Sequence, residues 1–442
     1  MNPIALATQA KGSLGVVRRA RAITQGYGLT ASKMGRSLAR LAELLAGFQC
    51  GGTFPITTAA LARSGGALAE FQAGRFELAV HGLYHIDHRR LSLDEQLEAF
   101  ARARRIFAER GVACYGFRCP YLRWSEQTVE AIERSGFLYD SSQGLAWDVV
   151  AEVETEAYRR VLAFYGARSA SAYPALPQLA GGLVRIPYCL PDDEALVERF
   201  GLASPRAMAG LWLAILAETH RLGELFTLGL HPERTPQCEA ALAETLRSAR
   251  ALRPHVWIAR LDEIARWWKA RAAAVVTSER ALSAGGARGW YAEAPGAAQE
   301  LRLSASGPAG LTFLARGVEL LGPSEPWDGA YRLVRGAEVA LRAERRPLIG
   351  LARGAAPQLA GFLRQQGYLA ETAEDPGDYA LFLDRPRFAP EDERPLLAQI
   401  EGGDFPLVRL GRWPDGAKSA LCVTGDIDAL SIWDYGLRFL GR

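Results

Sequence analysis

The chain has 442 residues, 49% of them hydrophobic, and its 52 Lys and Arg against 49 Asp and Glu leave a formal charge of only +3. Because the two signs are interspersed, the sequence offers no field that would favour nucleic acid or an anionic membrane as a partner. No apolar run reaches the roughly 18 residues of a membrane span and no signal-peptide pattern is present, so we expect a soluble cytoplasmic protein of two or three domains. The sequence leaves the oligomeric state open.

Seven short apolar or β-branched runs alternate with segments of helical period in the first 275 residues. One helix is expected from Ser92 and Glu95, which form a capping-box pattern, to Gly111. Seven strand–helix units predict an α/β fold, a distorted parallel (β/α) barrel whose chemistry sits at the carboxyl ends of the strands. The expected strands cover residues 51–57, 76–81, 112–118, 137–142, 183–188, 225–231 and 255–261.

The pattern changes near residue 285, where strands separated by Gly and Pro turns are expected over 301–322 and 331–344. A helix–strand pair over 358–368 and 378–384 and a helix over 392–403 follow. We therefore expect a smaller, β-rich α+β accessory domain over 285–410. A last buried strand at 419–424 and a helix from Ser431 complete the predicted elements.

Six cysteines are scattered through the chain without a C-x-x-C pair, which predicts free and mostly buried thiols rather than a zinc knuckle or disulfide framework. The stretch HGLYHIDH, residues 81–88, follows an expected strand. His81 and His85 are four residues apart and can chelate one divalent ion if the backbone turns helically after the strand. The alternative is a pair of surface or hydrogen-bonded histidines.

Three stretches in order, HGLYHIDHRRLS, GFRCPYLRW and TLGLHP, resemble motifs of the polysaccharide deacetylases, the NodB-homology group or carbohydrate esterase family four. This resemblance implies a distorted (β/α) barrel that hydrolyses an N-acetyl amide on a sugar with the help of a metal. It implies His81 and His85 as metal ligands, His231 as the general acid, Arg118 as the residue that orients the catalytic carboxylate, and Tyr121 as part of the oxyanion site.

The aspartate pair that opens this family is missing from the N-terminal part, where no Asp precedes Asp87. At the other end, RWPDGAKSALCVTGDIDALS resembles that motif. A circular permutation would insert strand 419–424 beside strand 51–57, so that residues 411–442 complete a barrel formed by 1–280. Asp426 would then be the catalytic base and Asp428 the third metal ligand. The alternative is that both are turn residues and that the enzyme is inactive.

The expected activity is the removal of an N-acetyl group from a sugar or glycan precursor. An amide hydrolase with a non-sugar substrate and a carbohydrate-binding protein without activity are the alternatives. Zn²⁺ is the expected metal, although Co²⁺, Ni²⁺ or Fe²⁺ fits similar ligands. Five further residues are candidates for the substrate pocket, and a cap, turn or surface role is equally expected for each: Asp140, Trp147, Asp148, Asp192 and Asp193.

Overall fold

The computed structural model describes residues 26–63, 68, 75–280 and 298–437. Two compact units are present, one from residues up to 252 with 258–266 and 420–442, the other from 253–257 and 267–419. Residue 285, where the accessory domain was expected to begin, lies outside the described residues, and residues 267–280 already belong to the second unit. The last expected helix is described as α13, Ile432–Leu437, and its remainder also lies outside them.

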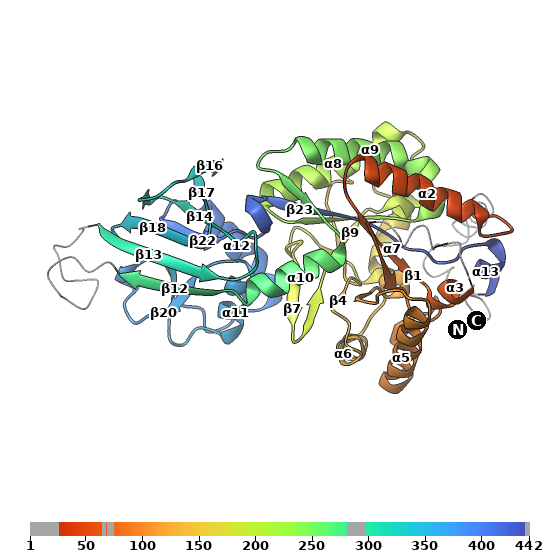
Figure 1. Cartoon of the computed structure of the whole chain (residues 1–442), viewed down its shortest axis with the longest axis horizontal. Coiled ribbons are helices and arrows are strands. Elements are labelled where there is room, and N and C mark those ends of the chain that lie inside the picture. The colour runs from red at the N-terminus through yellow and green to blue at the C-terminus, as the bar shows by residue number, and fades with distance from the viewer. Residues whose placement is uncertain (1–25, 64–67, 69–74, 281–297, 438–442) are drawn as a thin grey trace. The chain divides into compact units, whose positions relative to one another are not determined.

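One curled, mainly parallel sheet forms the centre of the first unit, in the order β6-β5-β9-β10-β23-β1-β2-β3-β4-β8-β7 (Figure 1). It runs from β6 at one end to β7 at the other, so the barrel is distorted and incomplete, and the predicted fold class is confirmed. Along this order its strands are β1 Gly52–Ile56, β2 Phe76–Val80, β3 Gly116–Phe117, β4 Tyr139–Asp140, β5 Gly144–Ala146, β6 Arg168–Ser169, β7 Gln178–Ala180, β8 Leu183–Arg185, β9 Tyr188–Leu190, β10 Leu225–Leu230 and β23 Ser419–Gly425, and β11 Val256–Ile258 belongs to the same sheet off this order.

The strand β23 lies in the interior of this sheet, between β1 and β10 and parallel to both. It pairs Thr424 with Thr53 on one side, and on the other it runs from Ala420 beside Leu225 to Gly425 beside Leu230. All seven of its residues are buried. The predicted position of the C-terminal strand beside 51–57 is therefore observed. It brings residues 426–428 to the side of the sheet where the carboxyl ends of β2, β3 and β10 also lie.

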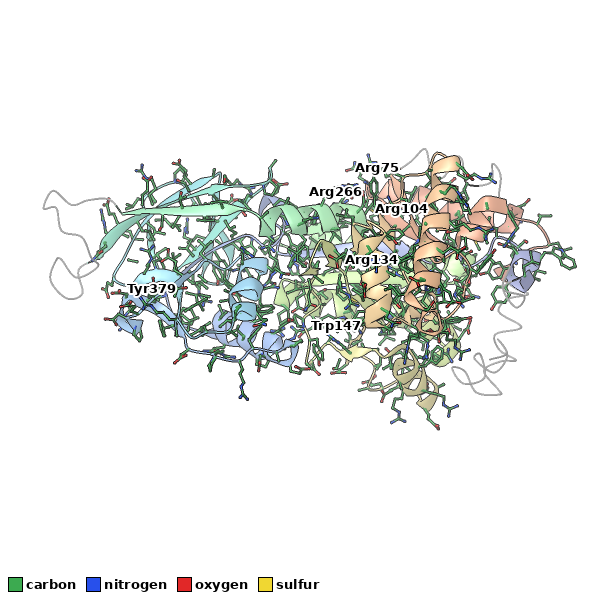
Figure 2. All side chains as sticks on the ribbon, turned by 90° about the horizontal axis from the view of Figure 1, so that it is seen from below. Arg75, Arg104, Arg134, Trp147, Arg266 and Tyr379 are labelled. Carbon is green, nitrogen blue, oxygen red and sulfur yellow. The ribbon has the colours of Figure 1, made fainter. Side chains whose placement is uncertain are left out.

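Helices cover this sheet, with α2 packed on α9, α8 on α9, and α5 on α6 (Figure 1). The capping box at Ser92 and Glu95 is formed as predicted. Arg104 of α5, labelled in Figure 2, donates to the carbonyl of Gly136 just after α6 and so links the two helices. The helices are α2 Ser32–Gly47, α3 Thr58–Arg63, α5 Leu93–Glu109, α6 Glu126–Arg134, α7 Glu156–Tyr165, α8 Pro205–Leu222, α9 Thr235–Ala251 and α10 Leu261–Ala272.

The second unit is β-rich, with antiparallel sheets β12-β13-β18-β15 and β16-β17-β14-β22 and a parallel sheet β20-β19-β21. Buried hydrophobic residues from both antiparallel sheets, among them Leu303, Phe313 and Leu341, share one core. The elements are β12 Val275–Arg280, β13 Gln299–Ser306, β14 Thr312–Arg316, β15 Glu319–Leu320, β16 Glu325–Asp328, β17 Tyr331–Arg335, β18 Glu338–Ala343, β19 Arg346–Leu351, α11 Pro357–Gln365, β20 Ala370–Thr372, β21 Tyr379–Leu383, α12 Glu393–Gly402 and β22 Leu407–Leu410.

Two general expectations can be compared with this fold. All six cysteines are free, and every one except the half-buried Cys114 is buried, as predicted. Among the described helices, none combines the length and apolar character needed to cross a bilayer.

Candidate active site

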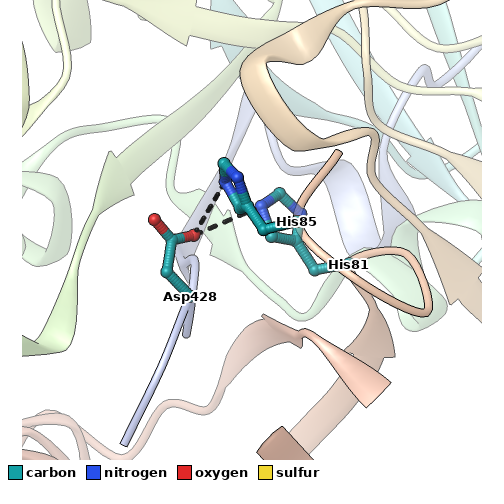
Figure 3. Close-up of side chains that lie close together, drawn as sticks. All are labelled: His81, His85 and Asp428. Atoms are coloured by element: carbon teal, nitrogen blue, oxygen red, sulfur yellow. Dashed lines mark ion pairs between the residues drawn. The ribbon is translucent and has the colours of Figure 1, made fainter. Parts of the chain in front are cut away.

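Three side chains with metal-binding atoms converge at the carboxyl ends of β2 and β23 (Figure 3). The ligand atoms of His81, His85 and Asp428 all lie within 4.8 Å of one another. Asp428 Oδ1 is 3.4 Å from His81 Nε2 and 3.3 Å from His85 Nε2. His81 Nδ1 is 3.0 Å from the backbone carbonyl of Arg118, which directs Nε2 toward the carboxylate. Two imidazole nitrogens and one carboxylate oxygen fit a divalent transition metal of the zinc type.

The loop after β2 does not make the helical turn expected from the spacing of the two histidines. It bends at Gly82, where φ is +76° and a Cβ would lie 2.8 Å from the carbonyl of Tyr84, so glycine is required. The expected helical route is wrong, but the bend still brings the rings of His81 and His85 to 5.2 Å between centroids. His88 of the same motif is fully buried, and its ring stacks on that of Phe100 with centroids 5.4 Å apart. It is not part of the cluster of candidate metal ligands.

Asp426 lies beside the cluster with its two carboxylate oxygens in different environments. Its Oδ1 accepts from Arg118 Nη1 at 2.6 Å, while Oδ2 is 3.9 Å from His81 Nε2. Burial alone would raise the pKa of Asp426, but the charge of Arg118 outweighs it and the pKa is lowered. Arg118 is itself 0% exposed and held by the backbone and hydroxyl oxygens of Ser141. An ionised carboxylate is thereby fixed next to the candidate ligands.

His231 follows β10 and is paired with Asp193. The ring Nδ1 is 2.7 Å from Asp193 Oδ1, and the backbone N–H of His231 donates to Oδ2 at 2.6 Å. Burial would lower the pKa of His231, but the Asp193 carboxylate prevails and raises it to about 10. A pKa raised this far favours the protonated imidazole at neutral pH.

Tyr121 reaches the same site from the loop after β3. Its ring stands edge-on to His85, with centroids 4.3 Å apart. Its φ is +59°, and that of Leu122 is +54°, a left-handed conformation that non-glycine residues adopt at a cost of about 1–3 kcal/mol. Backbone strain of this kind clusters at functional sites, and Tyr121 lies beside the candidate ligand His85.

Two of the remaining pocket candidates, Asp140 and Asp192, have structural partners of their own. Asp140 is 1% exposed, accepts from Ser142 and forms an ion pair with Arg185 at 3.4 Å. Trp147, labelled in Figure 2, is 4% exposed after β5. Asp192 accepts from the hydroxyl of Tyr188 at 3.0 Å and caps the backbone N–H of Ala195, while Asp148 is exposed.

In the sequence Asp193 was one of several acidic pocket candidates, and its contact with His231 was not predicted. The signal was present, because a histidine that acts as an acid needs a carboxylate to orient its second nitrogen. The sequence alone did not identify which acid this would be, since the chain separates the two residues by 38 positions.

Fold and site together define an α/β protein with a cluster of histidine and carboxylate side chains that could hold a metal ion at the carboxyl ends of its central strands. The family model for polysaccharide deacetylases matches residues 31–139, which include His81, His85 and Arg118. The resemblance inferred from the motifs is thus confirmed over this segment.

Similar proteins agree with this family. Over 94 residues the chain is 34% identical to the peptidoglycan deacetylase-like protein FGM2 of Gibberella zeae, a match that covers 20% of this chain and 24% of the relative. The chain therefore spans about a quarter of that relative's length.

Two solved structures are similar. One is assigned as a polysaccharide deacetylase from Mycobacterium smegmatis, with 22% identity, a TM-score of 0.42, and coverage of 59% of this chain and 86% of the other. The second is the allantoinase Puue, with 22% identity, a TM-score of 0.42, and coverage of 54% and 75%. At such identities and scores neither neighbour decides the substrate.

Proposed function

We propose that the chain is a metal-dependent hydrolase that removes the acetyl group from an N-acetylated sugar or glycan. The observation that carries the proposal is the convergence of His81, His85 and Asp428 on one point next to an ionised Asp426. These residues come from strands at opposite ends of the chain, and a structural role alone would not require two imidazoles and two carboxylates at one strand edge. The family match over 31–139 supports the acetyl amide as the bond that is cleaved.

In this proposal His81 Nε2, His85 Nε2 and Asp428 Oδ1 hold the metal. A divalent ion there supplies Lewis-acid polarisation of the acetyl carbonyl and activation of a water. The hydrogen bond between His81 Nδ1 and the carbonyl of Arg118 fixes the tautomer that leaves Nε2 as the ligand atom.

Asp426 acts as the general base. Arg118 occupies Oδ1, so Oδ2, on the side of the metal ligands, is the oxygen that takes the proton of the attacking water. The ion pair with Arg118 also fixes the carboxylate in one orientation, which keeps the base aligned with the water.

His231 acts as the general acid. Its Nδ1 is bound to Asp193, so Nε2 carries the proton that passes to the departing amine. Base and acid come from the adjacent strands β23 and β10, whose ends are joined by the hydrogen bond from Asp426 N to the carbonyl of Leu230. This adjacency supports proton transfer on both sides of one scissile bond.

We further propose that the chain is a circularly permuted member of its family, with the first motif supplied by β23. The placement of β23 between β1 and β10 supports this, because Asp426 and Asp428 then supply, at the end of β23, the aspartate pair that the N-terminal part lacks.

The test is acetate release by the full chain from N-acetylglucosamine oligomers, compared with ammonia release from linear and cyclic amides. Protein stripped by a chelator and then supplied with Zn²⁺, Co²⁺, Ni²⁺ or Fe²⁺ shows the metal requirement. Metal-dependent acetate release supports the proposal. Activity on small amides alone would replace the substrate class. Full activity of stripped protein would refute the metal-dependent mechanism, and no activity with any metal would favour a carbohydrate-binding protein.

A further inference from the structure

Arg271 of the second unit is a buried cation with unused hydrogen-bonding capacity. Arg271 is only 1% exposed, and its guanidinium lies over the ring of Trp268, 4.4 Å from the ring centroid. Nη2 donates to the carbonyl of Gln365. Within the described part of the chain, Nε and Nη1 have no hydrogen-bond partner and no carboxylate forms an ion pair with Arg271. A buried charge without a counter-charge is costly, so its retention calls for an explanation.

The nearby charges add to this imbalance. Burial first, and then the positive charges of Arg412 and Arg409, lower the pKa of Arg271 to about 9. Glu401 is the acid that contacts Arg409, at 3.4 Å, and its carboxylate also accepts from the hydroxyl of Tyr368. The cluster therefore holds more positive than negative charge, which favours an anion nearby.

Arg271 lines a cavity of about 420 Å³, a volume within the range of small-molecule sites. The cavity lies between the end of α10, α11, and strands of all three sheets in the second unit. Gly367, which also lines it, has φ +86°, and a Cβ there would lie 2.9 Å from Arg271 Nη1. The glycine thus leaves the unused side of the guanidinium uncovered.

The rest of the lining combines a second cation with apolar surface. Arg364 of α11 is exposed and lines the same cavity. The carboxylate of Glu371 also lines it, but both of its oxygens accept from Arg346 at 2.7 Å, so its charge is compensated. The apolar lining residues are Ala274, Val276, Leu303, Leu348, Leu369 and Leu410.

We propose that this cavity binds a small carboxylate with a short apolar chain, whose carboxylate contacts Arg271 and Arg364 and whose chain packs on the leucines. The two arginines supply charge-assisted hydrogen bonds, and the aliphatic lining removes the chain from water. The apolar lining favours an anion that carries an alkyl chain over bare phosphate, because phosphate would leave those leucines and alanine in contact with water. The site is independent of the active-site assignment in the first unit.

Isothermal titration calorimetry of the full chain with hexanoate tests the proposal, with 1-hexanol as the uncharged analogue and inorganic phosphate as the bare anion. Hexanoate is expected to bind at one site, at least about tenfold more tightly than hexanol, because the carboxylate adds charge-assisted bonds. Arg271→Met and Arg364→Met should each weaken hexanoate binding by roughly 10- to 100-fold. Arg302→Met, at an exposed strand position outside the cavity lining, is the matched control and should change nothing.

Circular dichroism shows whether Arg271→Met is folded. If it is not, Arg364→Met decides, because Arg364 is exposed and its loss leaves the core intact. Hexanoate that does not bind, that binds as weakly as hexanol, or that binds both arginine variants with unchanged affinity overturns the proposal. Phosphate binding without hexanoate binding overturns the assignment of a carboxylate.

Discussion

Replacing Asp193 by Asn separates the charge of this residue from its shape. The amide still contacts His231 Nδ1, but the negative charge that raises the pKa of His231 to about 10 is gone, and the burial that lowers it remains. Arg234 also lowers this pKa, Glu233 raises it, and both stay in place. The pKa of His231 should therefore fall to its ordinary value of about 6.5 or below.

The size of the effect follows from these two values. At pH 8 an imidazole of pKa about 10 is almost fully protonated, whereas one of pKa about 6.5 is protonated in roughly 3% of molecules, so the acid form falls about thirtyfold. A raised pKa in the folded state stabilises the fold fully below the unfolded pKa of about 6.5, and this stabilisation is lost as the pH rises through about 10.

The assay is kcat/KM for acetate release between pH 5 and pH 10, with unfolding by urea at the same pH values. The alkaline limb of the rate profile should move down by several pH units in Asp193→Asn, and the variant should lose stability chiefly at neutral and acidic pH. Asp94→Asn, at an exposed helix position, is the control. An alkaline limb that stays in place in Asp193→Asn would refute the acid role of His231.

Three further predictions concern the metal ligands, the general base and the general acid. His81→Ala should lose both bound metal and activity, whereas His88→Ala should keep the metal at some cost in stability, because His88 packs in the core; elemental analysis distinguishes the two. Asp426→Asn should keep its metal and its fold but lose turnover, and full turnover of this variant contradicts the base assignment. Asp428→Asn should instead bind metal more weakly, because an amide oxygen is a poorer zinc ligand than a carboxylate. His231→Ala should keep the metal and lose about 10² to 10⁴ in turnover, and metal loss in this variant would mean that its role is not that of an acid.

Strong local signals made much of the fold predictable. The run SALCVT predicted an interior strand because every residue in it is apolar or small, and the observed strand is buried along its whole length. The expected strands at 112–118 and 137–142 are observed as only two residues each, β3 and β4. Apolar composition marked those segments as buried, but composition does not set how many residues find a pairing partner.

Short and polar strands were beyond prediction. Strands such as β6 and β7 have two and three residues and lack an alternating pattern, so only the neighbouring strands define them. In the site, the spacing of the two histidines indicated His81 and His85, and the family resemblance implied His231. The missing aspartates directed attention to Asp426 and Asp428. The Asp193 contact could not be derived in the same way, because it depends on which strand ends are neighbours in the folded sheet.

The position of β23 has a kinetic consequence during synthesis. The ribosome completes β1, β2 and β10 long before residues 419–425 are made, and the whole second unit is translated in between. Until then the facing edges of β1 and β10 lack the strand that joins them, and unpaired edges invite pairing with other chains. The contact of Arg118 with Asp426 closes a sequence separation of 308 residues, and contacts this distant form slowly. A nascent chain should therefore gain its base and third candidate ligand last, and should depend on chaperones most strongly while the second unit is being translated.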